Sequence, residues 1–427
     1  MTAEIAIMNK SAVALAADSA VTIDGGPGGV KIYQTNKLFM LSKYHPVGLM
    51  IFNNAEMMNL PWESIIKYFR QQLGDRHHDS LEEYGSEFIT FLDGNLSLFP
   101  EEQQKKYFES TALSFLYAIR NSISQEVESI AHKGRRVSKT EIKAITVKQI
   151  KQHHDHLESS PLLPTIQQDF VEQTLRKYDS VLNAVIKQVY KKLPIPPSSN
   201  SLLKRFCANL FARDFQRSNY SGVVIAGFGS NDLYPSLVFY KVEGMVNNKL
   251  KYKLEDTTKI GKDSTASIVP FAQHEMVYTF IEGVDPLYQQ TVHRYLHELF
   301  DKYPRQFVKL LPNLTAKQRK ALVMKLQGIG RTIVGEFMNT MDKYSENKHV
   351  APILEIVDFL PLSELASMAE SLVNLTSFKR RFTMVPETVG GPIDVAVISK
   401  GDGFIWIKRK HYFEAASNPQ FLANYYR

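Results

Sequence analysis

The chain has 427 residues, of which 44% are hydrophobic and 22% are charged, and these proportions exclude collagen-like, coiled-coil and wholly disordered classes. The formal net charge is +7, from 51 Lys and Arg against 44 Asp and Glu, which allows an anionic partner without requiring one. The single cysteine, Cys207, excludes an internal disulfide and a zinc site built from thiolates. We therefore expect a reducing compartment.

The N-terminal sequence does not resemble a signal peptide, because Glu4 lies near its start and no basic segment leads into a long apolar one. The longest apolar runs, such as 223–226 and 393–398, are far shorter than the ~20 residues that span a bilayer. We expect a cytoplasmic protein with no membrane partner.

The N-terminal part of the chain predicts β-strands. Residues 4–8 and 12–17 are apolar segments separated by a short polar turn, which is typical of a hairpin. Two further apolar segments, 37–41 and 47–52, predict two more strands. From 55 to 73 the apolar residues recur at helical spacing, so we expect the first helix there.

The middle of the chain predicts mostly helices. Residues 80–217 have long charged helical faces interrupted by prolines. Strands return at 222–228 and 235–242, and a helical block covers about 268–346. Another helix is expected at 362–382.

The chain ends with a second predicted hairpin, in which 393–399 and 404–409 flank a glycine-containing turn. If the first and last strand groups pair, 80–217 and 286–350 are helical elaborations of one sheet-based core. Two independent domains are the alternative arrangement, but no clear linker separates them.

Thr2 is the first candidate for chemistry. A small residue at position 2 favours removal of Met1, which leaves Thr2 at the N-terminus. An N-terminal threonine supplies a hydroxyl nucleophile and an α-amine, with an ordinary pKa near ~8, that can act as its base. Because many proteins begin with Met-Thr, the surrounding residues must support this interpretation.

Asp18 and Lys37 give that support. Asp18 ends the strand that runs back along the first one, so we expect it near Thr2. Lys37 opens the next strand. A lysine beside the N-terminal amine lowers the pKa of the amine by like-charge repulsion, and an aspartate holds that lysine charged and oriented.

Together these residues resemble the proteasome β-subunit family of N-terminal nucleophile (Ntn) hydrolases. The similarity covers roughly a third of the chain, and the similar segments occur in the family's order. They are 2–6, 13–19, 36–39, 223–240 and the glycine-turn hairpin at 390–403.

The resemblance implies an α+β fold: a four-layer αββα Ntn-hydrolase sandwich, with two antiparallel sheets between helical layers and large α-helical insertions. It implies a single domain over 1–427. The expected core covers about 1–79, 218–285 and 351–415, and the expected insertions cover about 80–217 and 286–350.

The resemblance also implies roles for single residues. Thr2 matches the nucleophile, Asp18 the orienting acid and Lys37 the catalytic lysine. Lys31 competes for the lysine role, but the Asn-Lys-Leu-Phe segment that contains Lys37 fits the family pattern better. Thr22 falls where the family's substrate-binding strand begins, so its backbone would pair with an extended peptide.

Three positions depart from the family pattern. Asn53 stands where the family has the glycine whose backbone N–H stabilises the oxyanion; the N–H is retained, but the backbone has fewer conformations available. Pro386 and Val389 stand where the family often has Asp and Ser, with Glu387 or Thr388 as candidate replacements. These departures bear on activity more than on fold.

The leading interpretation is a threonine-type peptidase or amidohydrolase that needs no metal or organic cofactor. The histidine-rich segment 153–156 does not predict a metal site, because adjacent residues on a helix point apart. A peptide or unfolded protein as substrate, a homo-oligomer and an ATPase unfoldase as partner are implied by the family.

The alternative is a catalytically inactive Ntn-fold scaffold or binding protein. Residues 133–151 contain seven basic residues against one acidic residue, and they could contact a protein or nucleic-acid partner. A charged helix face balanced by acids elsewhere is the simpler explanation, so nucleic acid is the less favoured partner.

Overall fold

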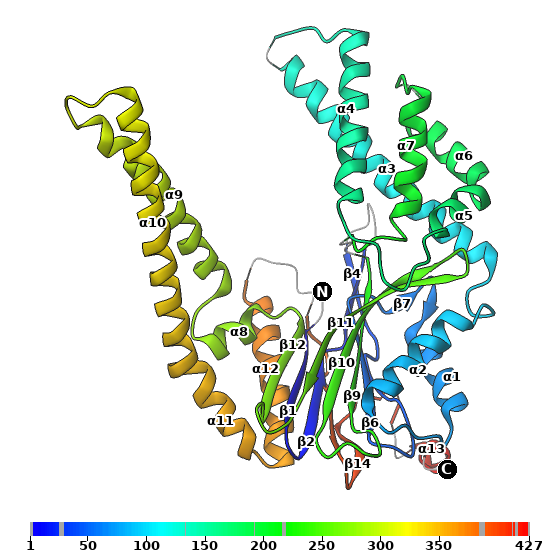
Figure 1. The fold of residues 1–427 in the computed structure, drawn as a ribbon. Helices are drawn as coiled ribbons and strands as arrows, with labels where there is room; N and C mark the ends of the chain where they lie inside the picture. Colours follow the sequence, from blue (N-terminus) through cyan, green and yellow to red (C-terminus); the bar gives the residue numbers. More distant parts are fainter. Residues whose placement is uncertain are drawn as a thin grey trace.

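The computed structural model contains two five-stranded sheets, helices on their outer faces, and two helical projections (Figure 1). No helix in the part of the chain that the structure describes is long and apolar enough to cross a membrane. The described residues are 3–24, 30–132, 134–191, 193–215, 219–383, 389–411, 413–414 and 417–425.

The first sheet has the order β12-β1-β2-β13-β14 and joins both ends of the chain. β1 (Ala3–Asn9) and β2 (Ala12–Ala17) form the predicted N-terminal hairpin, and β13 (Asp394–Ser399) pairs antiparallel with β2. β14 (Gly403–Lys408) completes the predicted C-terminal hairpin. The first and last strand groups therefore pair in one sheet.

β12 (Ala266–Ala272) lies at one edge of this sheet, where the sequence pattern predicted the start of a helical block. It pairs antiparallel with β1 and places Pro270 opposite Ile5. An edge strand tolerates proline, which has no N–H for the ladder. The helix prediction was wrong here because a short apolar run has no periodicity that separates a strand from a helix.

The second sheet has the order β11-β10-β9-β6-β5. The strands predicted for this sheet are present. β11 was not predicted, because most of its residues are polar and the predictions followed apolar segments. Its strands are β5 (Leu38–Met40), β6 (Val47–Phe52), β9 (Ser221–Gly227), β10 (Ser236–Val246) and β11 (Lys249–Lys259).

The first helix, α1, spans Trp62–Leu73 and starts later than the predicted position 55. A small hairpin of β7 (Glu56–Met57) and β8 (Leu60–Pro61) precedes it. Met58 and Asn59 between them have φ angles of 51° and 64°. Residues in this left-handed region cannot continue a right-handed helix, so the helix begins after them.

A hydrophobic cluster lies between the two sheets. Val13 and Leu15 of the first sheet share it with Val224 and Ala226 of the second, and all four are fully buried. The burial follows from strand alternation, because successive side chains point to opposite faces of a sheet. The chain thus encloses an apolar layer from which any charged group must be excluded or paired.

Helices cover both outer faces. On the first sheet, α12 packs with α8 and α11, and on the second sheet α1 packs with α2. The structure is thus α+β, with helices packed against each of the two antiparallel sheets (Figure 1). The bounds of these helices are α2 (Leu81–Gly94), α8 (Glu275–Glu282), α11 (Ala351–Phe359) and α12 (Leu362–Arg381).

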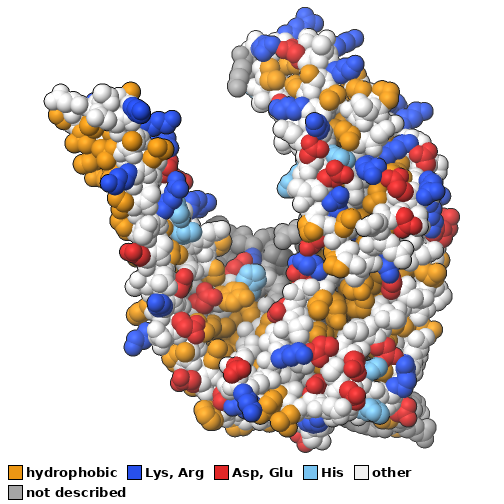
Figure 2. Space-filling view, viewed as in Figure 1, with side chains coloured by type: hydrophobic (Ala, Val, Ile, Leu, Met, Phe, Trp, Pro, Cys, Tyr) orange, Lys and Arg blue, Asp and Glu red, His pale blue; other side chains and the backbone are white. Residues whose placement is uncertain are grey.

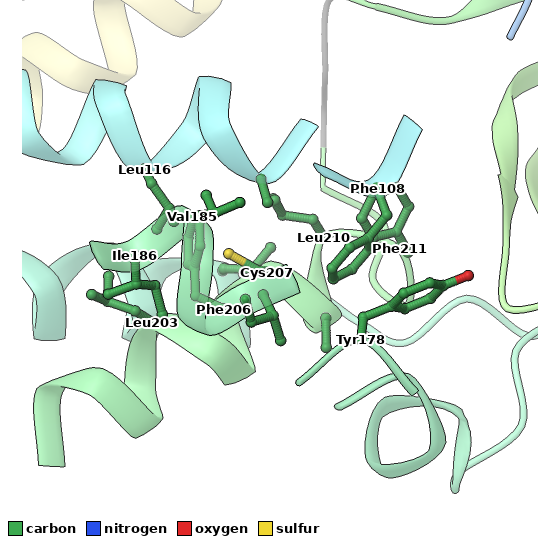
Figure 3. Close-up of a cluster of buried hydrophobic side chains, with 14 of the residues drawn as sticks. Phe108, Leu116, Tyr178, Val185, Ile186, Leu203, Phe206, Cys207, Leu210 and Phe211 are labelled. Atoms are coloured by element: carbon green, nitrogen blue, oxygen red, sulfur yellow. The ribbon is translucent and has the colours of Figure 1, made fainter. Parts of the chain in front are cut away.

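The first helical projection is a bundle of five helices, which we call the α3–α7 insertion. It has its own hydrophobic core, in which Cys207 is buried among aromatic and aliphatic side chains (Figure 3). Its helices are α3 (Glu101–Ala131), α4 (Lys139–Glu158), α5 (Phe170–Lys177), α6 (Asp179–Val189) and α7 (Pro197–Asn209).

The second projection, which we call the arm, is a hairpin of α9 (Pro286–Lys309) and α10 (Ala316–Ser345) that extends away from the sheets (Figure 1). A π-helical segment, Glu346–Val350, connects α10 to α11. A short helix, α13 (Pro419–Tyr425), lies near the C-terminus.

Candidate active site

Asp18 follows β2 directly and is fully buried. Its Oδ1 accepts a hydrogen bond from the N–H of Ala3 at 3.1 Å, and its Oδ2 accepts from the N–H of Gly390 at 3.0 Å and of Ala20 at 3.3 Å. The Asp18 N–H donates to the Ala3 carbonyl at 3.1 Å. These donors fix the carboxylate in one orientation at the start of β1.

Lys37 completes an ion pair with this carboxylate. Its Nζ lies 2.5 Å from Asp18 Oδ1, and only 4% of its side chain is exposed. The Lys37 carbonyl accepts a hydrogen bond from Ile51 N–H of β6 at 2.8 Å. The lysine therefore reaches from the second sheet to an acid of the first, through the apolar layer between them.

Glu4 is a second acid at the same ammonium group. Its Oε1 lies 3.5 Å from Lys37 Nζ, and its side chain is fully buried. Glu4 was not among the site residues predicted from the sequence. A signal was available, because Glu4 is the one charged residue in a strand whose seven residues are all buried. A carboxylate in such a strand needs a charged or hydrogen-bonding partner nearby.

Thr2, the predicted nucleophile, lies outside the described residues. The backbone nitrogen of Ala3, which is the atom that joins Thr2 to the described chain, is the donor at 3.1 Å from Asp18 Oδ1. The predicted orienting acid and the predicted lysine are thus in contact with each other at the first described residue of the chain.

Thr22 lies on β3 (Ala20–Asp24), which leads away from Asp18 and pairs with β4 (Val30–Gln34). At backbone level Thr22 is opposite Ile32. The side chains of Thr22 and of the competing Lys31 lie outside the described part of the structure.

Asn53 follows β6 and has a φ of 73°. This left-handed conformation favours glycine, and asparagine tolerates it better than most other residues. Its side-chain amide donates to the carbonyl of Tyr220 at 2.7 Å. Asn53 therefore adopts a glycine-like backbone, two residues beyond the Ile51 N–H that binds the Lys37 carbonyl.

The loop before β13 is held against the site by Ser19. The Ser19 N–H donates to the Gly390 carbonyl at 3.2 Å, and its hydroxyl donates to the carbonyl of Pro392. Val389, at one of the departures from the family pattern, is fully buried. Residues 386–388, which include Pro386 and both of its candidate replacements, lie outside the described residues.

A cavity of about 880 Å³ lies between β3, the segment after β6, and α3 of the insertion. Its size is within the range of sites that bind small ligands or peptide side chains. Sequence reasoning did not find it, because α3 meets the other two walls only through tertiary packing. Its lining includes Val21, Asn54, Glu56, Lys106, Tyr107 and Glu243.

The basic segment at 133–151 is partly neutralised. Arg135 forms an ion pair with Glu141, and Lys148 with Glu126. Among the described residues, no group of three or more His, Cys, Asp or Glu is placed to bind a metal ion.

No family model matches this sequence, and no curated protein matches it. Among solved structures, the chain is similar to an Anbu (Gly-1) mutant from Hyphomicrobium sp. strain MC1, with 9% identity, coverage of 99% of this chain and 95% of that chain, and a TM-score of 0.28. It is also similar to the Anbu complex from Pseudomonas aeruginosa, described as a helical assembly. The identity is 9%, the match covers 99% of this chain and 93% of that chain, and the TM-score is 0.28. A third similar structure is Anbu (ancestral beta-subunit) from Yersinia bercovieri, with 8% identity, coverage of 99% of this chain and 94% of that chain, and a TM-score of 0.27. Similarities at this level assign no activity.

Proposed function

We propose that this protein is a threonine-type peptidase or amidohydrolase in which Thr2, exposed by removal of Met1, is the nucleophile. The observation that carries the proposal is the buried Lys37–Asp18 ion pair, whose carboxylate also binds the N–H of Ala3. Desolvating two charges is costly, and such groups concentrate at functional sites. An ion pair buried beside Ala3 can tune the reactivity of an N-terminal residue at position 2.

The layer order supports an Ntn-hydrolase type of αββα sandwich as the framework. Two antiparallel sheets enclose an apolar layer, and helices cover both outer faces. In this proposal the first strand delivers the nucleophile, and the second sheet delivers the lysine.

The proposed reaction begins when the Thr2 hydroxyl oxygen attacks the carbonyl carbon of an amide. The Thr2 α-amine, directly or through a water, accepts the hydroxyl proton. The same proton then passes to the leaving nitrogen as the C–N bond breaks, which leaves an ester on Thr2. Water hydrolyses that ester to a carboxylic acid and restores the hydroxyl.

The other residues act on this sequence through their charge and position. The ammonium group of Lys37 lowers the pKa of the nearby α-amine, so that more of the amine is free to accept a proton. Asp18 holds Lys37 in place. The backbone N–H of Asn53 is proposed to stabilise the negative oxygen of the tetrahedral intermediate.

The substrate is proposed to be a peptide or an unfolded chain. An extended peptide can pair with the backbone of β3 near Thr22, as in strand addition. The cavity beside Val21 and Asn54 is then available for a substrate side chain. Its lining carries both acidic and basic groups, Glu56 and Lys106 among them, which suits a polar side chain.

The test combines intact mass with a covalent probe. Peptide epoxyketones need both a hydroxyl and a free α-amine on one residue, so they report this type of site. We expect purified protein to lack Met1 and to gain one probe mass, and the Thr2→Ala variant to gain none. Processed, folded protein that forms no adduct would contradict the proposal and favour the inactive scaffold.

A further inference from the structure

The arm is only two helices thick, and its helices touch along a single line. On α9 this contact line includes Phe300, Pro304 and Val308, and on α10 it includes Gly330 and Val334. A side chain at position 330 would meet Phe300, since an added Cβ would lie 2.7 Å from it. This line accounts for the packing of the hairpin on itself.

A second apolar line runs along each helix, and the described residues leave it about half exposed. It consists of large side chains at four-residue spacing, each with 39% to 55% of its surface exposed. We call this set the arm face: Leu299, Tyr303 and Phe307 on α9, and Ile329, Ile333 and Phe337 on α10.

The two lines of the arm face lie on the same side of the hairpin. Tyr303 directly precedes the contact residue Pro304, and Ile333 directly precedes Val334. Successive residues of an α-helix are rotated by about 100° around its axis. On both helices the exposed apolar line is therefore rotated from the contact line by about 100° in the same direction. Because the helices are antiparallel, this displacement points to one side of the hairpin for both.

Basic side chains gather on the opposite side. Residues 286–345 contain ten Lys and Arg against four Asp and Glu, which is +6 of the chain's net +7. By the same helical geometry, Arg294, Arg305 and Arg331 lie well over 90° from the apolar lines. In Figure 2, hydrophobic side chains gather on the edge of the arm turned away from the α3–α7 insertion, and Lys and Arg lie on the other edge.

We propose that the arm face binds the arm face of a second copy of this chain, so that two hairpins form a four-helix bundle between protomers. Each helix of the arm has one apolar line that contacts the other helix and one that is exposed, which is the pattern of half a four-helix bundle. A twofold axis lets the same patch serve both partners.

The size of the arm face fits this occupant. α9 has 24 residues, so it is about 36 Å long, and two adjacent helices are about 20 Å wide. The whole side of the hairpin that carries the arm face therefore covers roughly 700 Å², close to the ~800 Å² per partner that stable interfaces bury.

The charge distribution favours a second copy over an anionic lipid surface. An amphipathic hairpin that lay on anionic lipid with its apolar face inward would turn Arg294, Arg305 and Arg331 away from the headgroups. In the four-helix bundle the same residues face solvent on the outside, where their repulsion across the interface is screened.

The test measures the mass of the full-length protein in solution by light scattering, with Ile333→Lys/Phe337→Lys as the disrupting variant. The control, Thr332→Lys/Asn339→Lys, adds the same two charges on other sides of the same helix, at exposed positions. We expect the control to keep the mass of the unmodified protein and the disrupting variant to have half of it. Circular dichroism checks that both variants keep their helices.

A second measurement places the contact. The native Cys207 is fully buried, and burial raises the pKa of its thiol to about 12, so an introduced cysteine reacts selectively. We expect a flexible bismaleimide to link two Ile333→Cys chains and not two Thr332→Cys chains. A monomeric unmodified protein, an unchanged mass in the disrupting variant, or binding of monomer to phosphatidylserine vesicles through this face would overturn the proposal. None of these readouts requires hydrolysis, so the result is independent of the proposed activity.

Discussion

Between the two sheets, Lys37, Asp18 and Glu4 keep charged groups out of water, whereas along the arm Tyr303 and Ile333 keep apolar side chains in water. Both placements oppose the usual preference of these residue types. Between the sheets, ion pairs within the protomer offset the cost of burying these charges. In the arm the described residues leave 55% of Tyr303 and 45% of Ile333 exposed, and the partner proposed above would cover them. The two regions therefore differ in whether the described residues of one protomer compensate for these placements.

The largest expected effect is on activity. Replacing Lys37 by Met removes the cation that tunes the proposed base, so we expect kcat/KM for a peptide amide to fall by about 10²–10⁴-fold. Lys10→Met is the matched control, because Lys10, in the turn between β1 and β2, forms a partly exposed ion pair with Asp358 of α11 at 3.2 Å. Equal activity in the two variants would remove Lys37 from the mechanism.

The next effect concerns a thiol in the α3–α7 insertion. Burial raises the pKa of Cys207 to about 12, so we expect a thiol reagent at pH 8 to react about 10³-fold more slowly with folded than with unfolded protein. Because the folded-state pKa is above the unfolded one, the difference stabilises the folded protein below pH 9, and this stabilisation is lost as the pH rises toward 12. Fast labelling would show that the insertion does not hold its own core closed.

The buried ion pair of Lys37 and the partly exposed ion pair of Lys10 should contribute differently to the free energy of unfolding. Lys37→Met leaves Asp18 and Glu4 as buried carboxylates without their cation, which we expect to lower the free energy of unfolding by about 3–5 kcal/mol. The exposed pair of Lys10 should contribute less than about 1 kcal/mol. Urea unfolding of both variants measures the difference, and a loss below 1 kcal/mol at Lys37 would mean that water reaches the site.

The two helical projections can be compared in the same way. Leu116 is fully buried in the core of the insertion, so Leu116→Ala should cost about 2–5 kcal/mol. Ile333→Ala should cost about 0.5 kcal/mol or less in dilute protein, because Ile333 is exposed in the single chain. At high protein concentration its cost should rise, and a cost independent of concentration would argue against a partner.

The smallest expected effect is a shift in pH dependence. Glu4→Gln removes a negative charge 3.5 Å from Lys37 Nζ, which makes the surroundings of the α-amine more positive and lowers the pKa of that amine. The acid limb of the pH–rate profile should move to lower pH by up to about one unit. Glu4→Asp, which keeps the charge, should leave the profile nearly unchanged, and equal profiles in both variants would separate Glu4 from the site.

The sequence predicted the elements whose partners lie close along the chain. The hairpins at 4–17 and 393–409 have strong strand patterns around short turns, and both were predicted. The edge strand at 266–272 was missed because its identity comes from pairing with β1, far away in the sequence.

The site shows the same limit. The contact between Asp18 and Lys37 was predicted with the help of the family resemblance and is present, while their catalytic roles stay predictions. Glu4 was visible as an acid in an apolar strand, but its proximity to Lys37 depends on how two sheets stack. The wall that α3 adds to the cavity could not be predicted, because nothing in its periodicity says which sheet edge it covers.

The hydrogen bond from Gly390 N–H to Asp18 joins residues that are 372 positions apart. During synthesis Asp18 emerges from the ribosome long before the loop that holds it. The strand that pairs with β2, β13, also arrives only then. The growing polypeptide therefore cannot complete the contacts of Asp18 before residue 390 has been translated.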